Sequence, residues 1–174
     1  MEVPKQQDLE IEMRSPVPAL IRSLKAIDDI LRKGESFCLE KGIDASELLE
    51  ARIAPTMKPL THQIRLCCNH AAAATSLLSG KEALRIEGAY ETFQDLHARI
   101  AAARTAIGEI APEAFETASQ SILQITLDDR VTPVSAYDYL MEYALPSFYF
   151  SMTTAYNLLR SKGVPLGKLD FLGD

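Results

Sequence analysis

Apolar residues recur at three- and four-residue steps along most of the chain, which is the spacing that places them on one face of a helix. Four long stretches carry this spacing, at about 16–33, 59–79, 88–107 and 135–162. The first is predicted to break near Gly34, and a shorter helical segment that follows it is predicted to end at Gly42. Pro146 lies inside the last stretch and removes a backbone donor, so we expect a kink near residues 142–146.

The remaining segments differ from these helices. SILQITL, residues 121–127, alternates in polarity and contains β-branched residues, which predicts a short strand or extended segment. Residues 1–14 are polar and predict a flexible arm ahead of a single domain at 15–174. Four amphipathic helices joined by short links are typical of a four-helix bundle. The pattern therefore predicts an all-α, up-and-down four-helix bundle with short extra helices.

Charge and composition narrow the classes of function. The net charge of −6 argues against nonspecific binding to nucleic acid, which needs a basic surface. No apolar run approaches the roughly 20 residues of a membrane span, so no membrane partner is expected. The polar start of the chain has no apolar signal core, and we expect a cytoplasmic protein. Phosphate loops, dinucleotide fingerprints and nucleophilic serine motifs are absent from the sequence, so no cofactor is expected.

The cysteines do not predict a disulfide framework or a zinc site. There are three of them, Cys38, Cys67 and Cys68, and the adjacent pair lacks the two-residue gap of a chelating motif. We expect small, reduced, buried side chains.

Three segments resemble a known family. They are LLEARIAPTMKPLTHQIRLCCNHA, ETFQDLHARIAAA and YDYLMEYALPSFYFSMTTAYNLLRSKGVPLGKLDFLG. Together they resemble, over roughly residues 14–173, the family catalogued as domain of unknown function 1993, found in fungi and bacteria. That family is similar in fold to the DinB-like four-helix bundles. Several of those hold a divalent metal through three histidines, and the wider group includes thiol transferases and hydrolases.

The chain departs from the family pattern at positions that the resemblance associates with a metal. Ser151 and Ser161 stand where the family commonly has histidine. Thr56 and Asn69 stand where it commonly has aspartate, and His70 is the family-like histidine that is kept. We therefore expect no metal, because zinc and related ions need several His, Cys or carboxylate ligands.

The histidines of the sequence leave one metal alternative open. Besides His70 there are only His62 and His97, and no two of the three have the four-residue spacing of a chelating helical pair. Three ligands on separate helices could still converge in a bundle core. A residual site that involves these histidines therefore stays open.

The candidate site residues lie on two predicted helices. Gln63 and His70 are seven positions apart and share a face of the second helix. His70 is a candidate general acid or base because imidazole exchanges protons near neutrality. The alternative is a buried histidine that is satisfied by a neighbour.

Aromatic and hydroxyl side chains of the last helix complete the candidate site. Tyr149 is a candidate catalytic residue that would hold an oxyanion, and Tyr143, Ser151 and Tyr156 join Gln63 as candidate ligand contacts. Phenols and short hydroxyls beside a kink are typical of the walls of a small-molecule pocket. The alternative is ordinary core packing.

These observations give three hypotheses. The first is a metal-independent protein that binds a small apolar molecule in a pocket lined by Tyr, His and Ser. As an enzyme it would perform proton transfer, such as isomerisation, cyclisation or dehydration. The second is a metal-dependent DinB-like transferase or hydrolase with a reduced ligand set. The third is a non-catalytic bundle that forms a homodimer through an exposed apolar helix face.

Overall fold

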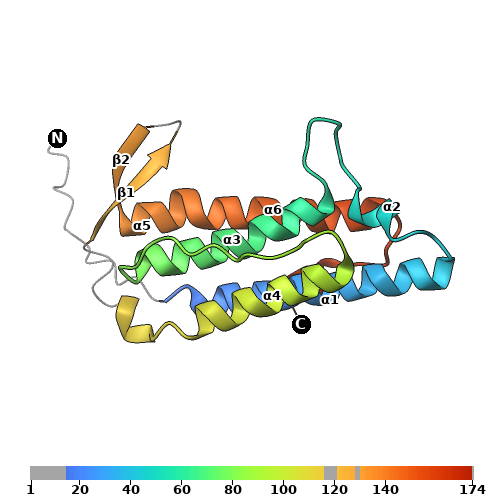
Figure 1. Ribbon diagram of the computed structural model, residues 1–174, viewed down its shortest axis with the longest axis horizontal. Helices are drawn as coiled ribbons and strands as arrows, with labels where there is room; N and C mark the ends of the chain where they lie inside the picture. Colours follow the sequence, from blue (N-terminus) through green and yellow to red (C-terminus); the bar gives the residue numbers. More distant parts are fainter. Residues whose placement is uncertain (1–14, 116–120, 128–129, 174) are drawn as a thin grey trace, which may run out of the picture.

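The computed structural model describes residues 15–115, 121–127 and 130–173, which form a bundle of long helices (Figure 1). The long helices are α1 (Val17–Lys41), α3 (Leu60–Leu78), α4 (Phe93–Gly108) and α6 (Leu145–Ser161). The short elements are α2 (Ser46–Leu49), the 3-10 helix η1 (Pro112–Phe115), the strands β1 (Ile122–Leu127) and β2 (Arg130–Ser135), α5 (Ala136–Asp138), the π-helix η3 (Tyr139–Ala144) and α7 (Lys168–Leu172). The predicted all-α bundle is confirmed. The arm expected over residues 1–14 lies outside the described residues.

Helix α3 lies between two neighbours. It packs against α6 on one side and α4 on the other, and α4 also packs against α1. The α1 residues Leu24, Ile27 and Leu31 are fully buried, as their three- and four-residue spacing requires. Phe148 of α6 is among the largest side chains enclosed in this core.

Helix α1 does not break at Gly34, and this prediction was wrong. The helix continues to Lys41 and ends at Gly42, whose φ of 64° is the left-handed conformation that glycine adopts without strain. Gly34 is buried, and a Cβ added to it would lie 3.1 Å from Leu159 Cδ2. The glycine therefore permits a close approach of α1 and α6 rather than ending the helix.

Helix α4 begins at Phe93 and not near residue 88 as predicted. Thr92 caps the helix, because its side chain accepts a hydrogen bond from the Asp95 backbone N–H at 3.1 Å. The Asp95 carboxylate accepts one in return from the Thr92 N–H at 3.0 Å. This reciprocal capping box fixes the start of the helix.

The region before α6 contains a hairpin that the sequence predicted only in part. The expected strand at 121–127 is confirmed as β1, but its partner β2 was not predicted, and the last helix starts at Ala136. Ser135 caps that start by accepting from the Asp138 N–H at 3.0 Å. The backbone is then a π-helix until Pro146 enters the first turn of α6, where a missing N–H costs little.

The C-terminal tail folds back against α1. Its short helix α7 is held by an ion pair between Lys33 Nζ and Asp170 Oδ1 at 2.5 Å. The ring of Phe171 packs edge-on against Tyr156 with centroids 5.8 Å apart. The tail therefore covers α1 and the end of α6 through both charge and apolar contacts.

The three cysteines are free and buried, as expected. Cys67 Sγ lies 3.9 Å from the carbonyl oxygen of Phe148, across the contact of α3 with α6. Burial raises the pKa of Cys68 to about 12. Across the described ranges, none of the helices combines the length and apolar character needed to cross a bilayer.

Candidate functional site

A groove lies between α3 and the beginning of α6, and we call it the His70 groove. Its lining residues are Leu66, His70, Pro146, Ser147, Phe150 and Ser151. Its volume is about 410 Å³, and it is open to solvent. Small-molecule sites have volumes of this order. The first two lining residues come from α3 and the other four from the first two turns of α6.

Local structure explains how α6 presents its part of the groove. Ser147, Phe150 and Ser151 are three and four residues apart, so they lie on one face of the helix. Phe148 points instead into the core, where it is 1% exposed, while Phe150 is 63% exposed. The π-helix η3 precedes this face directly, and π turns occur often beside functional sites.

His70 is half-buried, and this changes its acid–base behaviour. Removal from water disfavours the charged imidazolium and lowers the pKa of His70 below its usual range. The ring is therefore neutral at neutral pH, with one nitrogen as donor and the other as acceptor. Ser151, which is 1% exposed, lines the same groove and supplies a hydroxyl. The groove thus combines apolar walls with an imidazole and two hydroxyl groups.

The other predicted site residues do not line this groove. Gln63 is 3% exposed, and its Nε2 donates to the Lys58 carbonyl at 3.1 Å. Tyr149 packs edge-on against Phe148 with centroids 5.3 Å apart. Tyr156 contacts the tail near the far end of α6. Tyr143 is half-buried in η3. Of the predicted residues, the structure brings only His70 and Ser151 together in the groove.

Phe150 and Pro146 were not predicted as parts of a site. A signal was present, because Phe150 is three residues after Ser147 and one before Ser151 on a helix. The exposure of Phe150 cannot be read from this spacing, since the neighbouring Phe148 is buried instead.

The three histidines have three different surroundings. His62 packs edge-on against Tyr90 with centroids 6.4 Å apart. Burial, Arg65, Lys58 and Arg52 together lower the pKa of His62. Three cationic side chains therefore surround His62, and they disfavour the binding of another cation there.

His97 of α4 faces α1 rather than the His70 groove. Its Nδ1 lies 2.5 Å from Asp28 Oδ1, and its Nε2 lies 3.6 Å from Glu35 Oε2. The side chain of His97 is only 16% exposed. Asp28 is in turn bound by Arg32, so this carboxylate is shared between two partners.

The described residues do not fit the three-histidine metal site that the family resemblance implies. Among the residues whose structure is described, no three His, Cys, Asp or Glu side chains gather as a metal ion would require. Asn69 instead accepts from the Ile86 N–H at 3.1 Å and so anchors the loop after α3. Ser161 donates to the Leu158 carbonyl of its own helix at 2.8 Å. Both side chains therefore make hydrogen bonds to the backbone.

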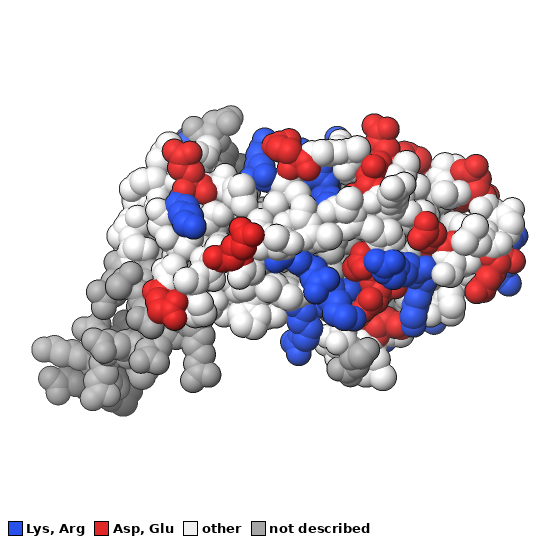
Figure 2. Space-filling model, turned by 60° about the horizontal axis from the view of Figure 1, so that its bottom comes forward, with Lys and Arg blue, Asp and Glu red and all other residues white. Residues whose placement is uncertain are grey.

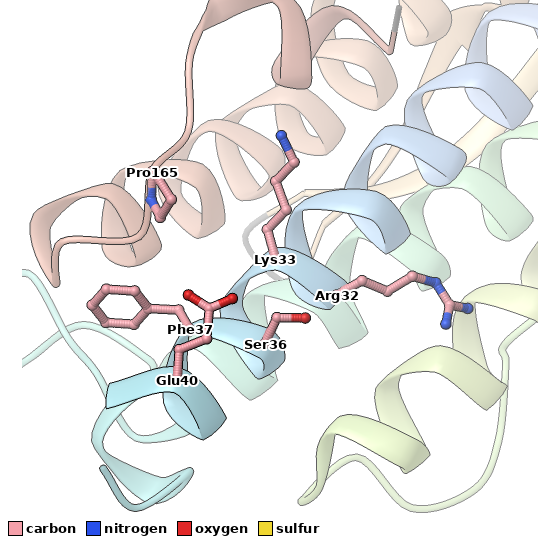
Figure 3. Close-up of a pocket in the computed structure, with 6 residues that line it drawn as sticks. All are labelled: Arg32, Lys33, Ser36, Phe37, Glu40 and Pro165. Atoms are coloured by element: carbon pink, nitrogen blue, oxygen red, sulfur yellow. The ribbon is translucent and has the colours of Figure 1, made fainter. Parts of the chain in front are cut away.

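A second, smaller depression lies where the tail passes α1 (Figure 3). Its volume is about 280 Å³, and it is lined by Arg32, Lys33, Ser36, Phe37, Glu40 and Pro165. Both cations have partners, since Arg32 pairs with Asp28 at 2.9 Å and Lys33 with Asp170. In Figure 3 the ends of Arg32 and Lys33 point in different directions. Figure 2, which turns the underside of Figure 1 forward, shows basic side chains beside acidic ones. This depression therefore offers no converging charge to a ligand.

Comparison with known proteins identifies the family. The sequence matches the family described as domain of unknown function (DUF1993) over residues 14–172. The chain belongs to the DUF1993 family. This DUF1993 chain is also similar to a crystal structure of a DinB family member protein from Shewanella denitrificans, with a TM-score of 0.83 and 30% sequence identity. The similarity covers 91% of this chain and 89% of the other, and the predicted DinB-like fold is confirmed. None of the curated proteins compared with the sequence matches it.

Proposed function

We propose that this DUF1993 chain binds a small, mostly apolar molecule that carries a hydroxyl or carbonyl group, with the His70 groove as its site. The observation that carries the proposal is a half-buried, neutral imidazole that lines an open groove with largely apolar walls. Sites for small molecules combine apolar surface with a few polar groups that fix orientation. Phe150 and Leu66 would supply the apolar contact, and Ser151 a second hydrogen bond.

If the bound molecule reacts, proton transfer is the chemistry that the site supports best. A neutral imidazole accepts a proton from a carbon or hydroxyl acid, and a lowered pKa keeps it in the accepting form at neutral pH. Ser147 and Ser151 would donate hydrogen bonds to a developing oxyanion. An isomerisation, cyclisation or dehydration fits this set of groups. Tyr149 as oxyanion holder, and Gln63, Tyr143 and Tyr156 as ligand contacts, stay predictions.

The test is a screen of small aliphatic and aromatic alcohols, ketones and phenols by two-dimensional NMR. We expect hits to shift the His70 imidazole signals and the amide signals of Phe150 and Ser151. His70→Ala and Ser151→Leu should each weaken the best hit at least about tenfold, the effect of losing about 1.4 kcal/mol of binding energy.

His62→Ala is the matched control for this screen. It removes another partly buried histidine with a lowered pKa from the same helix, but its ring faces Tyr90 and not the groove. The control should bind the hit with unchanged affinity. Equal weakening by His62→Ala and His70→Ala, or hits that map only outside the groove, would contradict the proposal.

A further inference from the structure

The hairpin formed by β1 and β2 has a fixed alternation of backbone groups. The strands pair antiparallel, with Ile125 opposite Thr132 and Gln124 opposite Pro133. Just before β1, the Ala136 N–H donates to the Ser121 carbonyl at 3.0 Å. In an antiparallel pair every second residue directs its N–H and C=O at the partner strand, and the residues between direct theirs outward. From Ser121 onward, the backbone N–H and C=O groups of the odd-numbered residues of β1 therefore face β2.

The outer edges of the two strands are not equivalent. The outward groups of β1 belong to Ile122, Gln124 and Thr126, and none of these three has a hydrogen-bonding partner within the described ranges. Opposite Gln124, Pro133 occupies the outward position of β2 and has no N–H to donate. Proline is one of the ways in which proteins blunt an edge strand. The edge of β2 is blunted in this way, and the edge of β1 is not.

The sequence of β1 favours pairing. ILQITL is rich in β-branched and apolar residues and contains no charge and no proline. Its outward residues Ile122, Gln124 and Thr126 are exposed, with Ile122 at 62%. The side chain of Ile125 points to the opposite face of the hairpin and is 8% exposed, so that face is covered. In Figure 1 the hairpin projects from the bundle near α5. An uncharged, unblunted edge of this kind is a template for another strand.

We propose that the free edge of β1 pairs antiparallel with β1 of a second copy of this chain. A two-fold axis at Gln124 sets Ile122 opposite the partner's Thr126, and Gln124 opposite the partner's Gln124. Each chain then donates through its three outward N–H groups and accepts through the carbonyls of the same residues. The hairpins join into one four-stranded sheet in the order β2–β1–β1–β2, with the blunted β2 edges outermost. Two strands alone are marginal in water, and four are a stable number.

A second copy suits this edge because identical strands pair about a two-fold axis, and the blunted β2 edges then end the sheet at two copies. Each chain carries a net charge of −6, so two copies repel one another overall and an interface between them has to avoid further like-charge contacts. Like charges placed directly opposite each other in a sheet are destabilising, and β1 brings none to the pairing. An antiparallel pair about a two-fold axis is self-complementary, as closed dimers require. This inference does not depend on the His70 groove, which is formed by α3 and α6.

The first experiment measures molar mass by light scattering over a concentration series. A range from about 1 µM to about 1 mM brackets dissociation constants of moderate and weak dimers. We expect the wild-type mass to rise from 19.2 kDa toward twice that value. Gln124→Pro removes the central outward donor while the inward ladder stays intact, as Pro133 shows for β2. It should stay at the monomer mass throughout, whereas the control Gln124→Thr should dimerise like wild type.

Amide hydrogen exchange of the wild-type protein separates this edge from any other interface. The amides of Ile122, Gln124 and Thr126 should exchange fast at low concentration and at least about tenfold more slowly in the dimer, because they become hydrogen-bonded. The amides of Leu123 and Ile125 already face β2 and should be protected at every concentration. A wild-type monomer at the highest concentration would overturn the proposal. So would a Gln124→Pro dimer as strong as wild type, or a dimer whose three outward amides stay unprotected.

Discussion

Two partly buried histidines, His97 and His70, have different surroundings in the bundle. His97 on α4 and His70 on α3 are both largely removed from water. His97 is held between Asp28 and Glu35 of α1, whereas His70 lines an open groove and has no ion-pair partner among the described residues. His97 Nδ1 is bound by Asp28, whereas the imidazole of His70 lies at the edge of an open groove. The contrast separates a histidine that joins two helices from one that lines the groove proposed here as a binding site.

The largest effect should follow from removing the histidine that joins α1 to α4. His97→Ala leaves the half-buried Asp28 carboxylate with only Arg32 as partner. Hydrogen bonds to charged groups are worth about 2 kcal/mol, so we expect the free energy of unfolding to fall by roughly this amount. Urea denaturation measures it. His62→Ala serves as reference, and an equal, small loss in both variants would show that the contact with Asp28 contributes no stability.

A smaller effect on stability is expected at His70. His70→Ala removes a ring that has solvent on one side and no charged partner, so unfolding free energy should change by less than about 1 kcal/mol. The same substitution should weaken binding of groove ligands at least about tenfold. If His70→Ala destabilised the fold as much as His97→Ala, the imidazole of His70 would be a structural group and the contrast between the two histidines would fail.

The pH dependence of stability sharpens the comparison further. Burial lowers the pKa of His70 in the folded state, so the unfolded chain binds more protons than the folded chain below about pH 6.5. The contribution of His70 is therefore fully present above that pH and is lost as the pH falls toward its folded pKa. The pKa of His62 is also lowered and acts in the same direction. Unfolding curves of His70→Ala should accordingly show a weaker loss of stability on acidification than wild type, and an unchanged slope would mean that His70 titrates normally.

The smallest effect should come from metal ions. The resemblance to metal-binding DinB-like proteins suggests a site, but the donor set of the described residues does not fit one. Addition of zinc, nickel or manganese should therefore leave the midpoint of thermal unfolding unchanged, and titration calorimetry should show no stoichiometric binding. Tight binding at one ion per chain, lost in His70→Ala, would place a metal in the groove and favour the metal-dependent hypothesis.

Local patterns in the sequence predicted the parts of the fold that depend on neighbouring residues. The spacing of Leu24, Ile27 and Leu31 predicts a buried helix face because helical neighbours are three and four residues apart. Gly34 misled the prediction, since its reason for being glycine is Leu159 of a different helix. Strand β2 was not predicted for a similar reason. Its sequence RVTPVS contains a proline, which argues against a strand, and the pairing with β1 forms the strand nonetheless.

The candidate site was predictable to the extent that it lies on single helices. The preserved His70 and the face of Ser151 could be read from the sequence, and they meet in the groove. The partnership of His97 with Asp28 spans 69 residues and has no signal in the spacing of either one. The separate positions of Tyr149 and Tyr156 likewise depend on packing against Phe148 and Phe171. Contacts between different elements determine the surroundings of these side chains, and such contacts cannot be read from the residue pattern of a single helix.

The buried thiols of α3 allow the opening of the bundle to be measured by the rate of covalent labelling. Cys67 and Cys68 are fully buried, and a thiol with a pKa of about 12, such as that of Cys68, holds almost no reactive thiolate at neutral pH. A reagent such as a maleimide can reach them only when α3 separates from its neighbours, so the labelling rate reports the opening of that contact. Because Cys67 lies one helical turn before His70, a molecule seated in the groove would slow the same reaction. Labelling rates could thus reveal an unknown ligand before anything is known of its chemistry.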